Sequence, residues 1–152
     1  MNLSKEQWLA TQTDPMDWPR NEYFQRLLDT AWQNNLALRS SKIHELWYYR
    51  PDSRTIFAWE PDLTREPLAY LLTVFAHELG HVRDFDRNPE FVATTKNLHY
   101  SNVPWEIEYS AFLSGFQLLQ ELAIPLSVEN YTFFIAPPMQ QQVLTALSTR
   151  SA

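Results

Sequence analysis

The chain of 152 residues contains no cysteine and only two glycines. Without cysteine there are no disulfides and no thiolate ligands, so histidine and carboxylate groups would have to hold any metal ion. Two glycines against ten prolines indicate connections stiffened by proline rather than flexible linkers. An apolar content of 45%, with 14% aromatic residues, is sufficient for a hydrophobic core. We therefore expect a single domain over residues 1–152, with an irregular N-terminal segment at residues 1–20.

Long apolar runs and clusters of positive charge are also missing. No window of eighteen apolar residues occurs, which argues against a membrane-spanning helix. Residues 1–10 lack the apolar region of a secretory signal, and a cytoplasmic location is therefore expected. The net charge of −6 and the lack of a Lys/Arg cluster argue against a nucleic-acid partner. Neither a membrane nor a nucleic acid is an expected partner, and the oligomeric state stays open.

The hydrophobic pattern predicts an α+β fold. Residues 43–50 and 54–59 are rich in aromatic and β-branched side chains and flank a Pro-Asp-Ser turn, which predicts a β-hairpin. Residues 84–101 are polar and read as a loop with a helical turn, whereas residues 131–136 are ambiguous between a strand and a buried turn. Helical periodicity predicts helices over residues 4–11, 21–34, 67–85, 104–122 and 138–147.

The motif that carries chemistry is H-E-x-x-H at His77-Glu78-Leu79-Gly80-His81, near the end of the helix predicted over residues 67–85. Positions i and i+4 of a helix share one face, so His77 and His81 can direct two imidazoles to one point, with Glu78 beside them. This arrangement is typical of a zinc ion with a carboxylate base. The alternative is a surface helix with two solvated histidines. Gly80, a poor helix former, indicates the close approach of another element.

A catalytic zinc ion usually has three protein ligands, so one ligand remains to be found. The metzincin extension of the motif is excluded, because Asp84 and Arg87 stand where it needs glycine and histidine. Glu106 and Glu108, on the next predicted helix, both qualify by position. They lie two residues apart and point about 200° away from each other, so only one of them can face the metal.

The H-E-x-x-H motif followed by Pro104-Trp105-Glu106-Ile107-Glu108-Tyr109-Ser110-Ala111-Phe112 resembles the gluzincin pattern. The likeness is to small zincin-like domains, namely the minigluzincins and the ImmA/IrrE-type metallopeptidases. It implies a zincin-like fold with Glu106 as the third zinc ligand, Glu108 as a second acidic residue and Phe112 as an apolar anchor. The chain departs from the pattern at Tyr109 and Ser110, where alanine and Asp or Asn are usual.

The resemblance implies a zinc metallopeptidase that acts on a peptide or protein substrate. Zn²⁺ would be held by His77, His81 and Glu106, with Glu78 as the general base. The strand expected at residues 54–59 would pair with an extended substrate by β-augmentation, unless it is an ordinary buried strand.

Four further residues are candidates for supporting roles. His99, Tyr100 and Tyr109 are candidate catalytic residues that would donate hydrogen bonds to the oxyanion. The alternative is that His99 and Tyr100 belong to a polar loop and that Tyr109 packs on its helix. Asp84, three residues after His81, is a candidate partner for an imidazole, with an exposed helix-end carboxylate as the alternative.

Two other functions compete with this interpretation. One is a catalytically silent zinc-binding interaction domain, which Glu78 argues against because a purely structural zinc ion needs no base. The other is a partner-regulated protease that acts on one specific protein, as the resemblance to ImmA/IrrE-type proteins implies. Residues 1–20 would cover the cleft as a pro-segment if the chain follows some minigluzincins, and are otherwise an irregular terminus.

Overall fold

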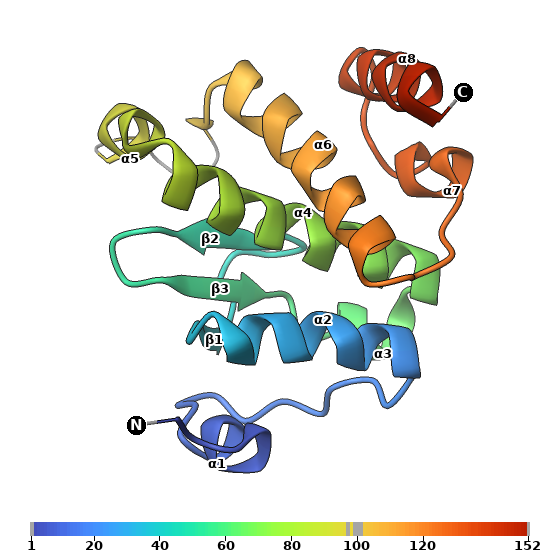
Figure 1. Ribbon diagram of the computed structural model, residues 1–152. Coiled ribbons are helices and arrows are strands. Elements are labelled where there is room, and N and C mark those ends of the chain that lie inside the picture. The colour runs from blue at the N-terminus through green and yellow to red at the C-terminus, as the bar shows by residue number, and fades with distance from the viewer. Residues whose placement is uncertain (1, 97, 99–101, 152) are drawn as a thin grey trace.

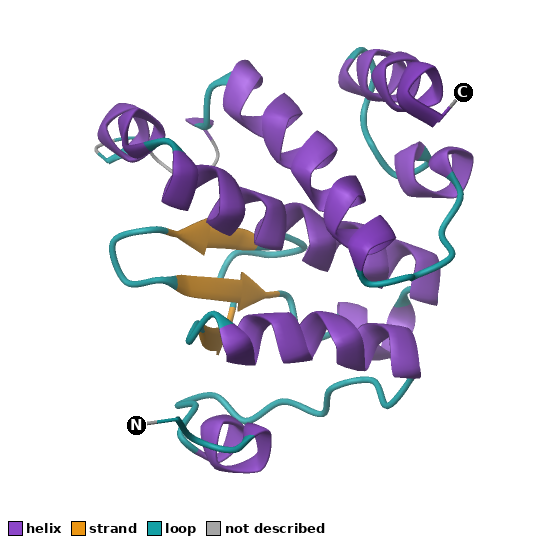
Figure 2. Ribbon diagram, viewed as in Figure 1, coloured by secondary structure: helices purple, strands orange, loops and turns teal. Residues whose placement is uncertain are grey.

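A computed structural model describes residues 2–96, 98 and 102–151 of the chain. These residues form an α+β fold in which helices surround a small three-stranded sheet (Figures 1 and 2). In chain order the elements are α1 (Lys5–Ala10), α2 (Glu22–Gln33), β1 (Ala37–Ser40), β2 (Tyr48–Arg50), β3 (Thr55–Ala58), α3 (Asp62–Arg65), α4 (Leu68–Arg87), α5 (Pro89–Thr95), α6 (Trp105–Glu121), α7 (Val128–Thr132) and α8 (Met139–Ser151). No helix in this described part of the chain is long and apolar enough to cross a membrane.

The sheet has the strand order β1-β3-β2. The predicted hairpin is confirmed, because β2 runs antiparallel to β3 with Tyr49 opposite Ile56. β1 adds to the other side of β3 in parallel register, with Leu38 opposite Ile56. β1 is not evident from the sequence, because only Leu38 of its four residues is buried and the segment has little alternation. β3 is thus the central strand, and β1 and β2 form the two edges.

The outer edge of β1 is covered by the N-terminal segment. The side chains of Gln12 and Asp14 accept hydrogen bonds from the backbone N–H groups of Leu38 and Ser40, at 2.9 and 3.0 Å. The bond from Ser40 also lowers the pKa of Asp14 below its usual range. These side chains take the place of a neighbouring strand and close an edge that would otherwise be open for pairing. Residues 2–16 therefore lie on the β1 side of the sheet, opposite β2.

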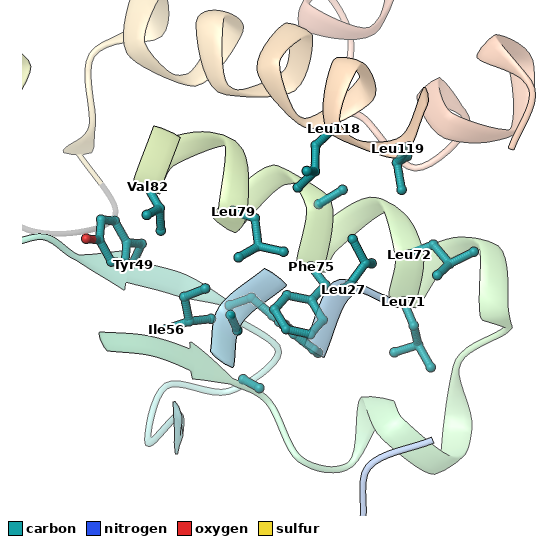
Figure 3. Packing of buried hydrophobic residues seen from close by; sticks show 14 of the residues in the cluster. Leu27, Tyr49, Ile56, Leu71, Leu72, Phe75, Leu79, Val82, Leu118 and Leu119 are labelled. Carbon is teal, nitrogen blue, oxygen red and sulfur yellow. The ribbon is translucent and has the colours of Figure 1, made fainter. Parts of the chain in front are cut away.

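Helix α4 lies at the centre of the packing and carries the H-E-x-x-H motif. Figure 3 shows Phe75 and Leu79 of α4 pointing toward Leu27 of α2 and Ile56 of the sheet, with Leu118 of α6 on the other side. Side chains on several faces of α4 are buried, as expected for a helix covered by neighbours on both sides. The motif is therefore held within the core, and the alternative of a surface helix with solvated histidines is wrong.

Helices α4 and α6 approach so closely that two glycines are required. A Cβ atom on Gly80 would overlap the carbonyl oxygen of Ala111, and one on Gly115 would lie 2.7 Å from that of Ala76. No side chain fits at either position, and these are the only two glycines in the chain. The close approach predicted at Gly80 is confirmed, and it sets the spacing between the two helices that build the site.

Residues 131–136 contain no strand, so the alternative of a turn applies. α7 occupies Val128–Thr132, with its N-terminus capped by the Ser127 side chain, and residues 133 and 134 form a turn before the buried Ile135. The polar stretch 84–101 is more helical than expected, since α4 continues to Arg87 and α5 follows at once.

Candidate metal centre

Two imidazoles and one carboxylate meet where α4 packs against α6. The Oε1 atom of Glu108 lies 2.6 Å from Nε2 of His81 and 3.5 Å from Nε2 of His77, and both imidazoles are buried. The three potential ligand atoms lie within 4.8 Å of one another. Ligand atoms around a tetrahedral zinc ion, at bond lengths of about 2.0–2.2 Å, lie about 3.4 Å apart. The distance between Glu108 and His77 already has about this value, whereas the distance between Glu108 and His81 would have to increase by about 0.8 Å. The group can therefore bind a metal ion.

The carboxylate that faces the histidines belongs to Glu108, and the preference for Glu106 is corrected. Glu106 is exposed and is not part of the group. The reason is the rotation of α6, which is fixed where Ala111 contacts Gly80. Glu108 lies three residues before Ala111 and therefore on the same face, one turn nearer the start of the helix. Glu106, two residues further back, points elsewhere.

The histidines determine the charge state of Glu108. Partial burial alone would raise the pKa of this carboxyl, but the charges and hydrogen bonds of His77 and His81 outweigh that effect and hold it well below its usual range. Glu108 is therefore an anion throughout the neutral range. As an acceptor only, it receives the hydrogen bond that Nε2 of His81 donates. A permanently ionised carboxylate is suited to bind a divalent cation.

Glu78 lies beside this group in a different electrostatic environment. Its side chain is buried, and burial raises its pKa from the usual 4.5 to about 8; His81 partly opposes this shift and Glu108 adds to it. Two carboxyl groups at one site thus have pKa values displaced in opposite directions, a feature typical of acid–base sites. Glu78 can exchange a proton near neutral pH, as a general base requires.

A phenyl ring lies nearly parallel to each imidazole. The rings of His77 and Phe112 have centroids 3.8 Å apart at an angle of 28°, and those of His81 and Phe85 are 5.5 Å apart at 24°. The Nδ1 atoms of both histidines are buried, and no atom of the described residues forms a hydrogen bond with them. The expected apolar role of Phe112 therefore takes the form of direct contact with the His77 imidazole.

Asp84 is buried, which excludes the exposed alternative for its carboxylate. Its Oδ1 atom accepts a hydrogen bond from the Ser114 hydroxyl at 2.5 Å, and its Oδ2 atom has no partner among the described residues. Asp84 thus links α4 to α6 next to the centre, and the structure shows no hydrogen bond from it to His81.

A cleft of about 670 Å³ opens over the centre. Glu78, His81 and Glu108 contribute to its lining, and the hairpin residues 46–52, which include β2, form one part of its wall. Residues of α5 and of the connection to α6 form another part. Besides the three acidic and imidazole groups, the lining consists of Leu46, Trp47, Tyr48, Tyr49, Arg50, Pro51, Asp52, Phe85, Val92, Thr95, Lys96, Leu98 and Val103.

The strand beside the cleft is β2, and the expectation that residues 54–59 receive a substrate strand is wrong. β3 occupies that segment and is already paired with β1 and β2 on its two sides. β2 is the edge strand that lines the cleft. Residues 2–16 line no part of this cleft, because they lie along β1 at the opposite edge.

Of the other residues predicted from the sequence, His99 and Tyr100 lie outside the described residues, and their role in catalysis stays a prediction. Leu98 and Val103, which flank them in the chain, line the cleft.

Comparisons of the chain with models of protein families, with curated proteins and with solved structures found no match. The case for function therefore depends on the residues of the site.

Proposed function

We propose that this protein is a zinc-dependent metallopeptidase of the gluzincin type, with His77, His81 and Glu108 as the zinc ligands and Glu78 as the general base. The observation that carries the proposal is the convergence of one carboxylate on the Nε2 atoms of both motif histidines. Two imidazoles and a carboxylate are a donor set that zinc favours in hydrolytic sites, and three protein ligands leave one coordination position open.

The chemistry follows from the placement of Glu78. When bound, zinc supplies the Lewis acidity that lowers the pKa of water and polarises a substrate carbonyl. Glu78 lines the same cleft and would accept the proton of the attacking water. It would then donate that proton to the amine of the broken peptide bond.

The two sheet edges support an extended peptide as the substrate. The β1 edge is closed by Gln12 and Asp14, whereas the β2 edge lines the cleft that contains Glu78. A peptide that pairs with β2 as an additional strand would pass its backbone along the centre, with binding energy from main-chain hydrogen bonds. Pairing of this kind does not depend on substrate sequence, so specificity would come from the side chains of the cleft wall.

The experiment that tests the proposal combines metal analysis with a peptide-hydrolysis screen. Purified wild-type protein should contain one zinc ion per chain and cleave members of a peptide library, with products identified by mass spectrometry. Glu78→Gln should retain the zinc ion but lose activity by about 100-fold or more. Glu106→Gln, a change of an exposed glutamate on α6, is the matched control and should behave as the wild type.

Two outcomes would contradict the proposal in different ways. Wild-type protein that binds no zinc would remove the metal centre altogether. Stoichiometric zinc without hydrolysis of any peptide would instead favour the catalytically silent zinc-binding domain.

A further inference from the structure

The ligand histidines depart from a common rule of metal sites. A metal-binding histidine usually donates its other ring N–H to a carboxylate, a carbonyl or water, and this hydrogen bond fixes the tautomer and the orientation of the ring. Here the Nδ1 atoms of His77 and His81 are buried, and neither bonds to any of the described residues. Buried polar atoms without a partner are rare, so the orientation of these rings needs another cause.

Aromatic side chains occupy the faces of both rings. Phe112 stacks on His77 with ring centroids 3.8 Å apart, the shortest such separation among the described ring pairs. Phe85 lies one helical turn after His81, is nearly parallel to it, and packs in turn on Tyr49 of β2 at 5.9 Å. Close contact between nearly parallel rings restricts rotation about the side-chain bonds of both residues.

The position of Phe112 in the chain links this contact to the ligand set. Phe112 follows Glu108 by four residues, so both side chains project from the same face of α6, one turn apart. The backbone at this point is held from the other side, because the buried hydroxyl of Tyr131 donates a hydrogen bond to the Phe112 carbonyl at 2.6 Å. Two residues one turn apart on α6 therefore contact the histidines: the Glu108 carboxylate contacts both imidazoles, and the Phe112 ring stacks on that of His77.

We infer that Phe112 and Phe85 are the positioning residues of the metal centre, setting the planes of His77 and His81 by ring stacking where most metal sites use a hydrogen bond. This inference rests on the metal centre of the proposed function. An imidazole without a hydrogen-bonded Nδ1–H is a weaker donor than one with such a bond, since the outer partner raises ligand basicity. The centre should therefore hold its metal through geometry that depends on the two phenyl rings.

The test is metal affinity in variants that remove a ring but keep an apolar side chain. Zn²⁺ affinity is measured by competition with a chromophoric chelator, and Co²⁺ is substituted to record the visible absorption of the ligand field. Phe112→Leu should weaken Zn²⁺ binding by about 10-fold and change the Co²⁺ spectrum, because outer contacts of metal ligands have effects of about 10–100-fold. Phe85→Leu should act in the same direction through His81.

Phe116→Leu is the matched control. Phe116 is a more deeply buried phenylalanine on the same helix, one turn further on, and its ring packs on Tyr131 at 5.1 Å. Its substitution should lower the midpoint of thermal unfolding but leave the Zn²⁺ affinity and the Co²⁺ spectrum unchanged.

The inference is overturned if folded Phe112→Leu and Phe85→Leu both bind Zn²⁺ as tightly as the wild type with the same Co²⁺ spectrum. It is also overturned if Phe116→Leu weakens binding as much as they do, because the effect would then be one of general stability. In both cases the wild type still binds zinc, so the proposed metal centre survives. Should Phe112→Leu fail to fold, Phe85→Leu decides the question alone. Wild-type protein that binds no metal removes the inference together with the centre.

Discussion

Glu106 and Glu108 have the same side chain and stand two residues apart on α6, yet only Glu108 reaches the histidines. Their difference is one of direction, set by the rotation of α6 against α4 at the contact between Gly80 and Ala111. The resemblance to the gluzincin pattern favours Glu106, because the start of the helix and Phe112 align with that pattern. The rotation of one helix against another depends on residues far apart in the chain, so no pattern within α6 reveals it.

The role of Glu108 gives the first prediction. Glu108→Gln should weaken Zn²⁺ binding by more than the roughly 10–100-fold that loss of an outer contact costs, since it removes an anionic ligand. Glu106→Gln should leave the affinity unchanged. The zinc content of each variant after dialysis tests both expectations. Zinc lost only from Glu106→Gln would contradict the assignment and restore the ligand that the resemblance implied.

The second prediction concerns Glu78 in protein kept metal-free with a chelator. Its pKa is about 8 in the folded state and about 4.5 in the unfolded chain, so the folded state binds the proton more tightly. The resulting stability is fully present below pH 4.5 and is lost as the pH rises through 8. Glu78→Gln is neutral throughout, so it should be more stable than wild type above pH 8, by a few kcal/mol as an order of magnitude.

Thermal unfolding of the two metal-free proteins between pH 5 and pH 9 measures this difference. It should be small at the acid end and grow with pH; a difference that does not change with pH would contradict the buried, proton-binding state of Glu78.

At the scale of elements, the close contact between α4 and α6 determines the site. Gly80→Ala should gain up to about 1 kcal/mol of helix propensity, but its Cβ atom would overlap the Ala111 carbonyl. Because backbone rather than a flexible side chain is in the way, we expect a net loss of about 1–3 kcal/mol. The helices must separate, so Zn²⁺ affinity should fall as well.

Gly115→Ala meets the Ala76 carbonyl in the same contact, farther along α6 from Glu108. It should be similarly destabilising in chemical denaturation but should affect Zn²⁺ affinity less. An unchanged affinity in Gly80→Ala would mean that the spacing of the helices does not control the ligands.

The helices that the sequence predicted best are those with a long apolar pattern. The periodicity predicts α2, α4 and α6 nearly residue for residue, because each has apolar residues at helical spacing over its whole length. The sequence does not predict β1, since only Leu38 of its four residues is buried and no alternation marks the strand. The H-E-x-x-H motif lies within one helix, so the sequence alone locates the candidate site. Which strand lies at the edge beside the cleft depends on the order of the strands in the sheet, which no local pattern reveals.

At the scale of the whole molecule, the N-terminal segment supports the fold from the side opposite the cleft. Trp8 is buried and donates a hydrogen bond from Nε1 to the Leu36 carbonyl at 2.8 Å. Trp8→Ala should therefore reduce the free energy of unfolding by about 3–5 kcal/mol, the cost typical of removing a buried aromatic side chain. Zn²⁺ affinity, measured well below the unfolding temperature, should stay the same.

Phe133→Ala is the control for this change, because 70% of the Phe133 side chain is exposed and its removal should alter stability little. The rate of peptide hydrolysis by Trp8→Ala distinguishes an N-terminal segment that only stabilises the fold from one that also inhibits the proposed activity. An increase in activity would show that residues 1–20 restrain the enzyme as a pro-segment, despite their place along β1.

The short contact between His81 and Glu108 has a consequence for the exchange of metal. A hydrogen bond already joins these two groups when no metal ion is bound. At the proposed centre, metal uptake would replace the proton of this bond by a cation, and acid would shift that exchange toward release. The same hydrogen bond would hold the two side chains together after the ion leaves, so that reloading would need no refolding.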